Sequence, residues 1–263
     1  MARDKKMRSL SLTGLFLVSI LLSLALPANT VSASNETTSG TITGTETWAG
    51  VHTLTGDVTI APGAKLIINP GATIEFPNGT HLDVRGSLCA GVASCGASSN
   101  AGPAMRINLR WSEPINASAT GECYGMSYGN QEIWIDDPSC SEGVLMRSSI
   151  DLAETGLRYV NFDSAWGIPQ YITAVGEFRY GALVLDGASP TLTELSFNQI
   201  NTSSVLTTNL AQPSVNGGDF AVGIDANTGI VGAALQIYSS GSSVNPFSLS
   251  DISLTGTNNG CGD

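Results

Sequence analysis

The residues of this sequence that could do chemistry form few recognisable constellations. A G-x-S-x-G string, of the kind that places a nucleophilic serine on a sharp turn, occurs as GMSYG around Ser127. Such a serine needs a strand before it, a helix after it and a histidine later in the chain. Because His52 and His81 both precede it, we interpret the string as part of a Gly/Ser/Tyr loop.

Carboxyl groups could act as acid and base on a glycosidic bond if two of them lay about 5–10 Å apart. Asp136 and Asp137 are adjacent, but neighbouring side chains of a strand point to opposite faces. The later acids, such as Asp163, Asp186 and Glu194, are scattered singly. We therefore assign no catalytic residue, while a paired-carboxylate site stays open.

A calcium site has a weak candidate in the stretch GIDANTG, residues 223–229, where Asp225 and Asn227 alternate as in some calcium loops. The bidentate glutamate of an EF-hand loop is missing, so a turn-rich connection is the preferred interpretation. His52 and His81 have no second His or Cys at the spacing of metal ligands, and we expect them at the surface or in a cap. The sequence therefore indicates no cofactor, and calcium stays an open alternative that no specific motif supports.

Composition narrows the choice of partners. After residue 33 the chain keeps seven basic and twenty-one acidic residues, which gives a formal net charge of −14. Phosphate contacts need clustered Lys and Arg, so nucleic acid is not an expected partner, and acidic polysaccharides are poor partners for the same reason. The expected partners are an extracellular glycan or another cell-surface protein. The four tryptophans could include a sugar-stacking platform, but packing in the core or a cap is the default for Trp.

The N-terminus predicts export. Four basic residues precede an apolar run from Leu10 to Leu26, and the small residues before Ser34 resemble a signal-peptidase site. We predict a cleaved signal peptide over residues 1–33, with an uncleaved anchor as the alternative. No second hydrophobic run follows, so we expect no transmembrane segment after the signal and a secreted or cell-surface location.

Five cysteines lie beyond the predicted signal peptide, and their spacing matches no zinc motif. In an exported chain they indicate disulfides. Short local loops favour the pairs Cys89–Cys95 and Cys123–Cys140, while a cross pairing such as Cys89–Cys123 stays open. Cys261 is left over, and its partner is expected in sequence outside this chain.

Four Asn-x-Ser/Thr sequons are candidate glycosylation sites if the host has the machinery. They are Asn35, Asn78, Asn116 and Asn201.

The clearest structural pattern is a phrase that repeats every eight residues in GDVTIAPGAKLIINPGATIEFPNGTHLDV, residues 56–84. Apolar and polar residues alternate around Gly-containing turns, which is typical of short strands with one buried face. Such short units are expected to stack, and three of them suit one coil of a three-sided solenoid. An antiparallel meander is the alternative. The residues expected to point inward are Val58, Ile60, Leu66, Ile68, Ile74, Phe76, Leu82 and Val84; Lys65, Glu75 and Asp83 are expected to point outward.

A second pattern, with apolar residues at i, i+3 and i+5, begins at Leu157, Leu192 and Leu249. The last two belong to copies of one strand–turn–Pro–strand–strand unit. Their separation leaves room for one extra coil or for a long loop such as residues 202–228. Residues 89–145 lack any periodicity, so we interpret them as an insertion held by disulfides.

Two stretches resemble known families. GDVTIAPGAKLIINPGATIEFPNGTHLDVRGSL resembles the opening coils of right-handed parallel β-helix surface proteins, and GALVLDGASPTLTELSFNQIN resembles the coil repeats of the pectin-lyase-like superfamily. The resemblance implies an all-β fold, a right-handed parallel β-helix (β-solenoid) over residues 48–263 with the disulfide-bearing insertion 89–145. Residues 34–47 are then a polar, Thr-rich lead-in. The ending after residue 257 favours a fragment of a longer protein.

The superfamily contains lyases, glycoside hydrolases, adhesins and autotransported passengers, so the fold alone fixes no activity. Its lyases use a basic residue with calcium-binding carboxylates, but Arg158 and Arg179, the basic residues of the later coils, lie in no such motif. We expect an exported cell-surface protein with a structural, adhesive or glycan-binding role. The alternative is a carbohydrate-active enzyme, either a polysaccharide lyase or a glycoside hydrolase.

Overall fold

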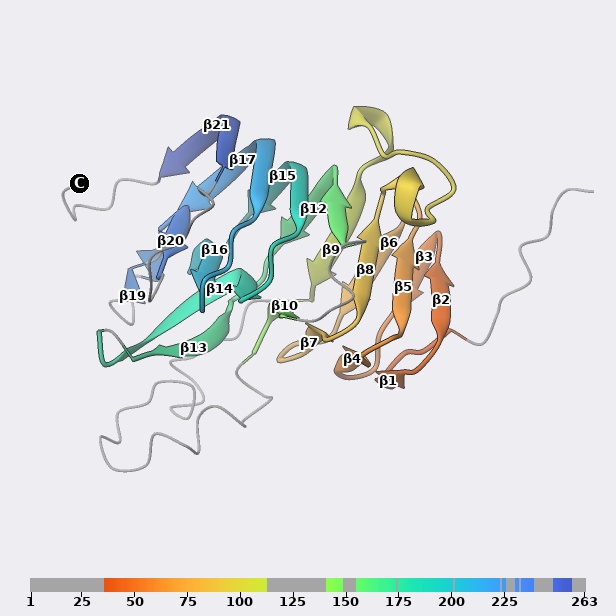
Figure 1. Cartoon of the computed structure of the whole chain (residues 1–263), viewed down its shortest axis with the longest axis horizontal. Helices are drawn as coiled ribbons and strands as arrows, with labels where there is room; N and C mark the ends of the chain where they lie inside the picture. Colours follow the sequence, from red (N-terminus) through yellow and green to blue (C-terminus); the bar gives the residue numbers. More distant parts are fainter. Residues whose placement is uncertain are drawn as a thin grey trace, which may run out of the picture. The chain divides into compact units, whose positions relative to one another are not determined.

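In a computed structural model of the protein, the structure describes residues 36–112, 141–148, 155–173, 175–200, 202–222, 224–225, 230–231, 233–238 and 248–256 (Figure 1). These residues form an all-β structure. Its helical elements within the described ranges are two short 3₁₀ turns, η1 (Ala93–Cys95) and η2 (Pro103–Met105). The predicted signal peptide lies outside these ranges.

The first sheet has eight strands in the order β1-β4-β7-β10-β14-β16-β20, with β13 paired to β14. Its neighbours are parallel except for the β13–β14 hairpin. The strands are β1 (Gly40–Ile42), β4 (Val58–Ile60), β7 (His81–Val84), β10 (Gly143–Arg147), β13 (Ile168–Ile172), β14 (Glu177–Asp186), β16 (Ser203–Thr208) and β20 (Leu235–Ile237).

The second sheet has eleven strands in the order β2-β5-β8-β11-β15-β12-β9-β6-β3, and β17 and β21 continue it from β15. The strands are β2 (Thr45–Trp48), β3 (Val51–Thr53), β5 (Lys65–Ile68), β6 (Thr73–Phe76), β8 (Ser87–Ala90), β9 (Ile107–Trp111), β11 (Gly156–Arg158), β12 (Val160–Asp163), β15 (Thr191–Asn198), β17 (Ser214–Val222) and β21 (Ser248–Gly256). A small antiparallel pair joins β18 (Ile224–Asp225) and β19 (Ile230–Val231).

Each strand from β1 to β9 pairs with the strand three places later in the sequence, which gives the series β1–β4–β7–β10, β2–β5–β8–β11 and β3–β6–β9–β12. The pairs are parallel, so the antiparallel meander is wrong. Val58 lies opposite Leu82, which is the predicted period of three eight-residue units. Parallel neighbours need a long crossover between them, and here the two intervening strands supply it.

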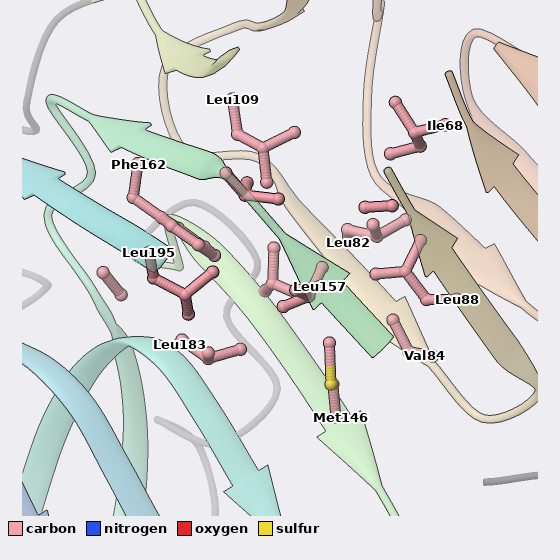
Figure 2. Packing of buried hydrophobic residues seen from close by; sticks show 14 of the residues in the cluster. Ile68, Leu82, Val84, Leu88, Leu109, Met146, Leu157, Phe162, Leu183 and Leu195 are labelled. Atoms are coloured by element: carbon pink, nitrogen blue, oxygen red, sulfur yellow. The ribbon is translucent and has the colours of Figure 1, made fainter. Parts of the chain in front are cut away.

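The core lies on the inward faces of both sheets. All eight residues expected to point inward are at most 1% exposed, which confirms the alternation. Figure 2 shows side chains from different strands, among them Leu82, Leu157 and Leu183, converging on one interior. Aromatic rings of successive strands also stack there, with the ring centres of Phe162 and Phe197 separated by 4.7 Å.

The three residues expected to point outward differ in their solvent exposure. Lys65 and Glu75 are partly exposed, as predicted. Asp83 also lies on the outer face, but it is only 4% exposed. The Asp83 carboxylate accepts from the Nε of Arg85 at 2.8 Å and from the Nε of Arg147 at 3.1 Å. These two arginine side chains cover the acid on the outer face.

The spacing i, i+3, i+5 has a backbone cause. Tyr159, Glu194 and Asp251, the residues at i+2 of the three copies, have φ angles of 51°, 54° and 54°. A left-handed residue turns the chain sharply. Apolar residues three apart, such as Leu192 and Leu195, are therefore both buried on the same interior.

A further copy of this unit fills the range in which a long loop was the alternative. Strands β16 and β17 occupy most of residues 203–222, so the extra coil was the better of the two predictions. Val215 and Phe220 are buried, and the left-handed corner is Gly217, with φ 71°. The sequence pattern missed this copy because a second glycine, Gly218, stands where the others have an apolar residue.

The predicted insertion at residues 89–145 is too long. Strand β9 lies within this range, paired with β6 and β12, and its Ile107, Leu109 and Trp111 are buried. The ends of β8 and β10 also fall inside it. The irregular chain between β8 and β9 covers only residues 91–106, and residues 113–140 are outside the described ranges.

Candidate functional site

The candidate site is built on the outer face of the second sheet, where β15, β17 and β21 lie side by side (Figure 1) and β11 pairs with β15. Alternation along each strand buries residues such as Leu192 and Val215 and turns their neighbours outward. Strand register places these neighbours in two rows. The rows are Gly156, Thr191, Ser214 and Ser248, and Arg158, Thr193, Asn216 and Ser250.

Six residues of these rows carry only hydroxyl or amide groups, and we call them the hydroxyl face: Thr191, Thr193, Ser214, Asn216, Ser248 and Ser250. Thr193 is partly exposed and the other five are exposed. Within the second row, the Ser250 hydroxyl donates to the Asn216 Oδ1 atom at 3.2 Å. The face therefore presents a regular array of uncharged donors and acceptors.

At one end the hydroxyl face opens into a groove of about 460 Å³ between β11 and the loop that follows β8. Polar groups from Ser94, Asn100, Thr155, Arg158, Thr191 and Thr193 line it. The loop is fixed by the Cys89–Cys95 disulfide and by a bond from the Ala93 amide to Asn100 Oδ1 at 3.0 Å. Ile67 and Ala97 pack beneath it with Cys89.

Arg158 is the cation of the groove, whose lining includes no carboxylate among the described residues. Its Nε atom donates to the carbonyl of Ala101 at 3.0 Å, and its guanidinium lies 5.2 Å from the centre of the Tyr159 ring. These contacts fix the cation at the edge of the groove. The site thus has a rigid positive end and an uncharged face.

The outer face of the first sheet differs in chemistry. Leu145, Val184 and Leu206 lie in register there and are buried together with Ile168 of β13. Burial also raises the pKa of the Tyr180 phenol. This face is thus closed by its own hairpin, whereas the hydroxyl face is open.

The acids considered for catalysis are not brought together. Asp163 lies 3.4 Å from Arg110 in the second sheet, and Asp186 lies 3.8 Å from Arg147 in the first. Glu194 is a corner residue of β15. Within the described ranges no three His, Cys, Asp or Glu side chains are grouped so as to hold a metal ion.

The histidines and tryptophans have structural surroundings. His52 stacks on Trp48 at 4.3 Å, and its Nδ1 atom lies 2.6 Å from Glu36 Oε2 near the start of the described chain. Trp48, Trp111 and Trp166 are fully buried, so these three offer no platform for a sugar ring. The His81 amide donates to Asp57 Oδ1 at 2.9 Å.

Several predicted site residues fall outside the described part of the chain, and nothing is assigned to them. They are Ser127, Asp136, Asp137, Cys123, Cys140, Cys261, Asn35, Asn116, Asn201, Asn227 and the side chain of Asp225. The remaining sequon residue, Asn78, is exposed between β6 and β7.

In comparisons with known proteins, no protein-family model, curated protein or solved structure matches the chain. The described residues also contain no helix with the length and hydropathy needed to cross a membrane. Sequence reasoning missed the hydroxyl face. Its signal is the recurrence of TLT, SVN and SLS at residues 191, 214 and 248, each a polar pair around one apolar residue.

Proposed function

We propose that the protein is an exported, right-handed parallel β-helix of the pectin-lyase-like type that binds glycans at the cell surface. The recurrence of every third strand in parallel register supports the β-helix. Parallel crossover connections are right-handed in nearly all proteins, which supports the handedness. The left-handed corners at Tyr159, Glu194, Gly217 and Asp251 repeat at one position of four copies of the same unit, as expected of a solenoid.

The observation that carries the function is the open hydroxyl face in a chain with a large negative charge. Exposed acids would be the ordinary way to keep such a surface soluble, yet none of the eight positions in the two rows is an acid, and one of them, Arg158, is charged. Hydroxyl and amide groups can donate to and accept from sugar hydroxyls. A regular, uncharged polar face therefore supports a role in binding a hydroxyl-rich polymer.

The arrangement of acids favours binding over turnover. Hydrolysis needs two carboxyl groups across a cleft, whereas Asp163 and Asp186 belong to different sheets and each faces an arginine. Lyase chemistry needs a cation or metal beside a base. Arg158, the cation of the groove, has no carboxylate among the described lining residues.

The location at the cell surface has two supports. The N-terminal sequence has the pattern of a cleaved signal peptide. The Cys89–Cys95 disulfide fits an oxidising compartment, because such bonds are rare in reducing ones.

The proposed function is tested by incubating the purified protein with insoluble neutral polysaccharides, pectate and alginate, with and without calcium. We expect retention on at least one polysaccharide with no release of reducing ends or unsaturated products. Turnover that is lost on replacing Asp163, Asp186 or Glu194 would instead establish the carbohydrate-active enzyme. Failure to bind any polymer would remove the glycan-binding role.

A further inference from the structure

We infer that the hydroxyl face takes an uncharged, extended polysaccharide that lies across β15, β17 and β21, with one end in the groove beside the Cys89–Cys95 loop. This inference rests on the proposed function and names the class of ligand, its site and its direction.

The spacing sets the direction of the ligand. Neighbouring strands are about 4.8 Å apart, and residues i and i+2 of one strand are about 6.7 Å apart. A polymer crossing the strands meets an equivalent pair of polar groups at every step: Thr191 with Thr193, Ser214 with Asn216, and Ser248 with Ser250. A polymer running along a strand would meet one such pair and then the left-handed corner. A repeating ligand therefore gains most by crossing the strands.

The charge distribution selects an uncharged ligand. The six residues of the hydroxyl face are neutral, while the chain after residue 33 carries a net charge of −14. A polyanion would be repelled by the whole molecule and would meet no cation along the face. Arg158 lies at the groove end of the rows, where the hydrogen bond from its Nε atom to Ala101 and its contact with the Tyr159 ring hold the guanidinium in place. It can orient one sugar residue but cannot neutralise a charged polymer.

The groove gives the face a closed end. Gly156 occupies the next position of the first row, and its missing side chain leaves room between β11 and the loop. An added Cβ there would lie 3.4 Å from the side chain of Val92, so the loop that follows β8 lies close to Gly156. The terminal sugar residue would be enclosed by Ser94, Asn100 and Thr155, while the rest of the polymer lies on the open face.

The test uses isothermal titration of the purified protein with xylohexaose, cellohexaose, mannohexaose and chitohexaose, and with hexagalacturonate as the acidic probe. Asn216→Asp keeps the oxygen that accepts from Ser250 but adds a charge to the face. Thr193→Val keeps the shape of the side chain but removes the hydroxyl. Asn198→Asp is the matched control, because Asn198 is also exposed on β15 but lies beyond the corner residue Glu194.

We expect a neutral hexaose to bind more tightly than the acidic one, with a loss of about five- to tenfold in affinity for each face variant. The control should stay within about twofold, and the unfolding midpoints of all three variants should match the parent. If the affinity for the neutral hexaose is unchanged in both face variants, or falls equally in Asn198→Asp, the proposed position of the site is wrong, although glycan binding itself is retained. Preference for the acidic probe overturns the ligand class alone. No binding of any probe removes this inference, and retention on the insoluble polymers then decides the proposed function separately.

Discussion

The buried carboxylate of Asp83 shows how one residue can depart from the pattern of its strand. The alternation of side chains along β7 turns Asp83 outward, yet Arg85 and Arg147 cover its carboxylate. Removing the acid leaves two guanidinium groups facing each other without their shared partner. Their side chains are 51% and 41% exposed, so solvent screening reduces the effect below that of a fully buried pair.

We therefore expect Asp83→Ala to lower the free energy of unfolding by about 1–3 kcal/mol, measured by urea denaturation. Arg85→Ala is the control, because Asp83 keeps Arg147 as a partner, and its cost should be below about 1 kcal/mol. Equal stability of Asp83→Ala and the parent would mean that the two arginines turn into solvent without loss.

At the scale of elements, the turn between β7 and β8 explains where the eight-residue phrase ends. The turn from β4 to β5 uses four residues, 61–64, whereas the turn from β7 to β8 uses only Arg85 and Gly86. Gly86 lies directly against the preceding turn, since an added Cβ would be 2.3 Å from the carbonyl oxygens of Ala61 and Ala64. The shorter turn changes the register, so that Lys65 pairs with Ser87.

Gly86→Ala should therefore destabilise the protein by about 3 kcal/mol, because two backbone carbonyls would have to move. Gly44→Ala is the matched control: it lies in the turn between β1 and β2, and an added Cβ there meets nothing within 4 Å. The control should change the free energy of unfolding by less than about 1 kcal/mol. Thermal unfolding followed by circular dichroism separates the two, and equal midpoints would show that the turns are not in contact.

The same elements show what could be predicted from the sequence. Strands β4 to β7 follow one after another with short turns, so alternation alone located their buried residues. Strand β9 pairs with β6, where Asn108 lies opposite Thr73. Because β7, β8 and an irregular loop separate these two strands in the sequence, the eight-residue period could not locate β9. No local pattern could show that Arg147 of β10 reaches Asp83 on the neighbouring strand β7. The hydroxyl face was missed for a related reason, since its rows exist only once the strands are in register.

At the scale of the whole molecule, charge repulsion opposes the compact state. The chain after residue 33 has twenty-one acidic residues and seven basic ones, and in the described ranges Arg85, Arg110 and Arg147 are already paired with acids. The remaining acids repel one another at neutral pH. The screening length falls from about 30 Å at 0.01 M salt to about 3 Å at 1 M, so added salt weakens this repulsion strongly.

We expect the free energy of unfolding at pH 7 to rise when sodium chloride is raised from 0.01 M to 1 M, measured by urea denaturation of the purified protein. The control is the same titration near the isoelectric point, ≈ 4.4 for the full chain, where the net charge is small and the salt effect should shrink. Short-range pairs such as Arg110–Asp163 are weakened by salt and act in the opposite direction. A fall in stability with salt at pH 7 would therefore mean that these pairs outweigh the repulsion among the acids.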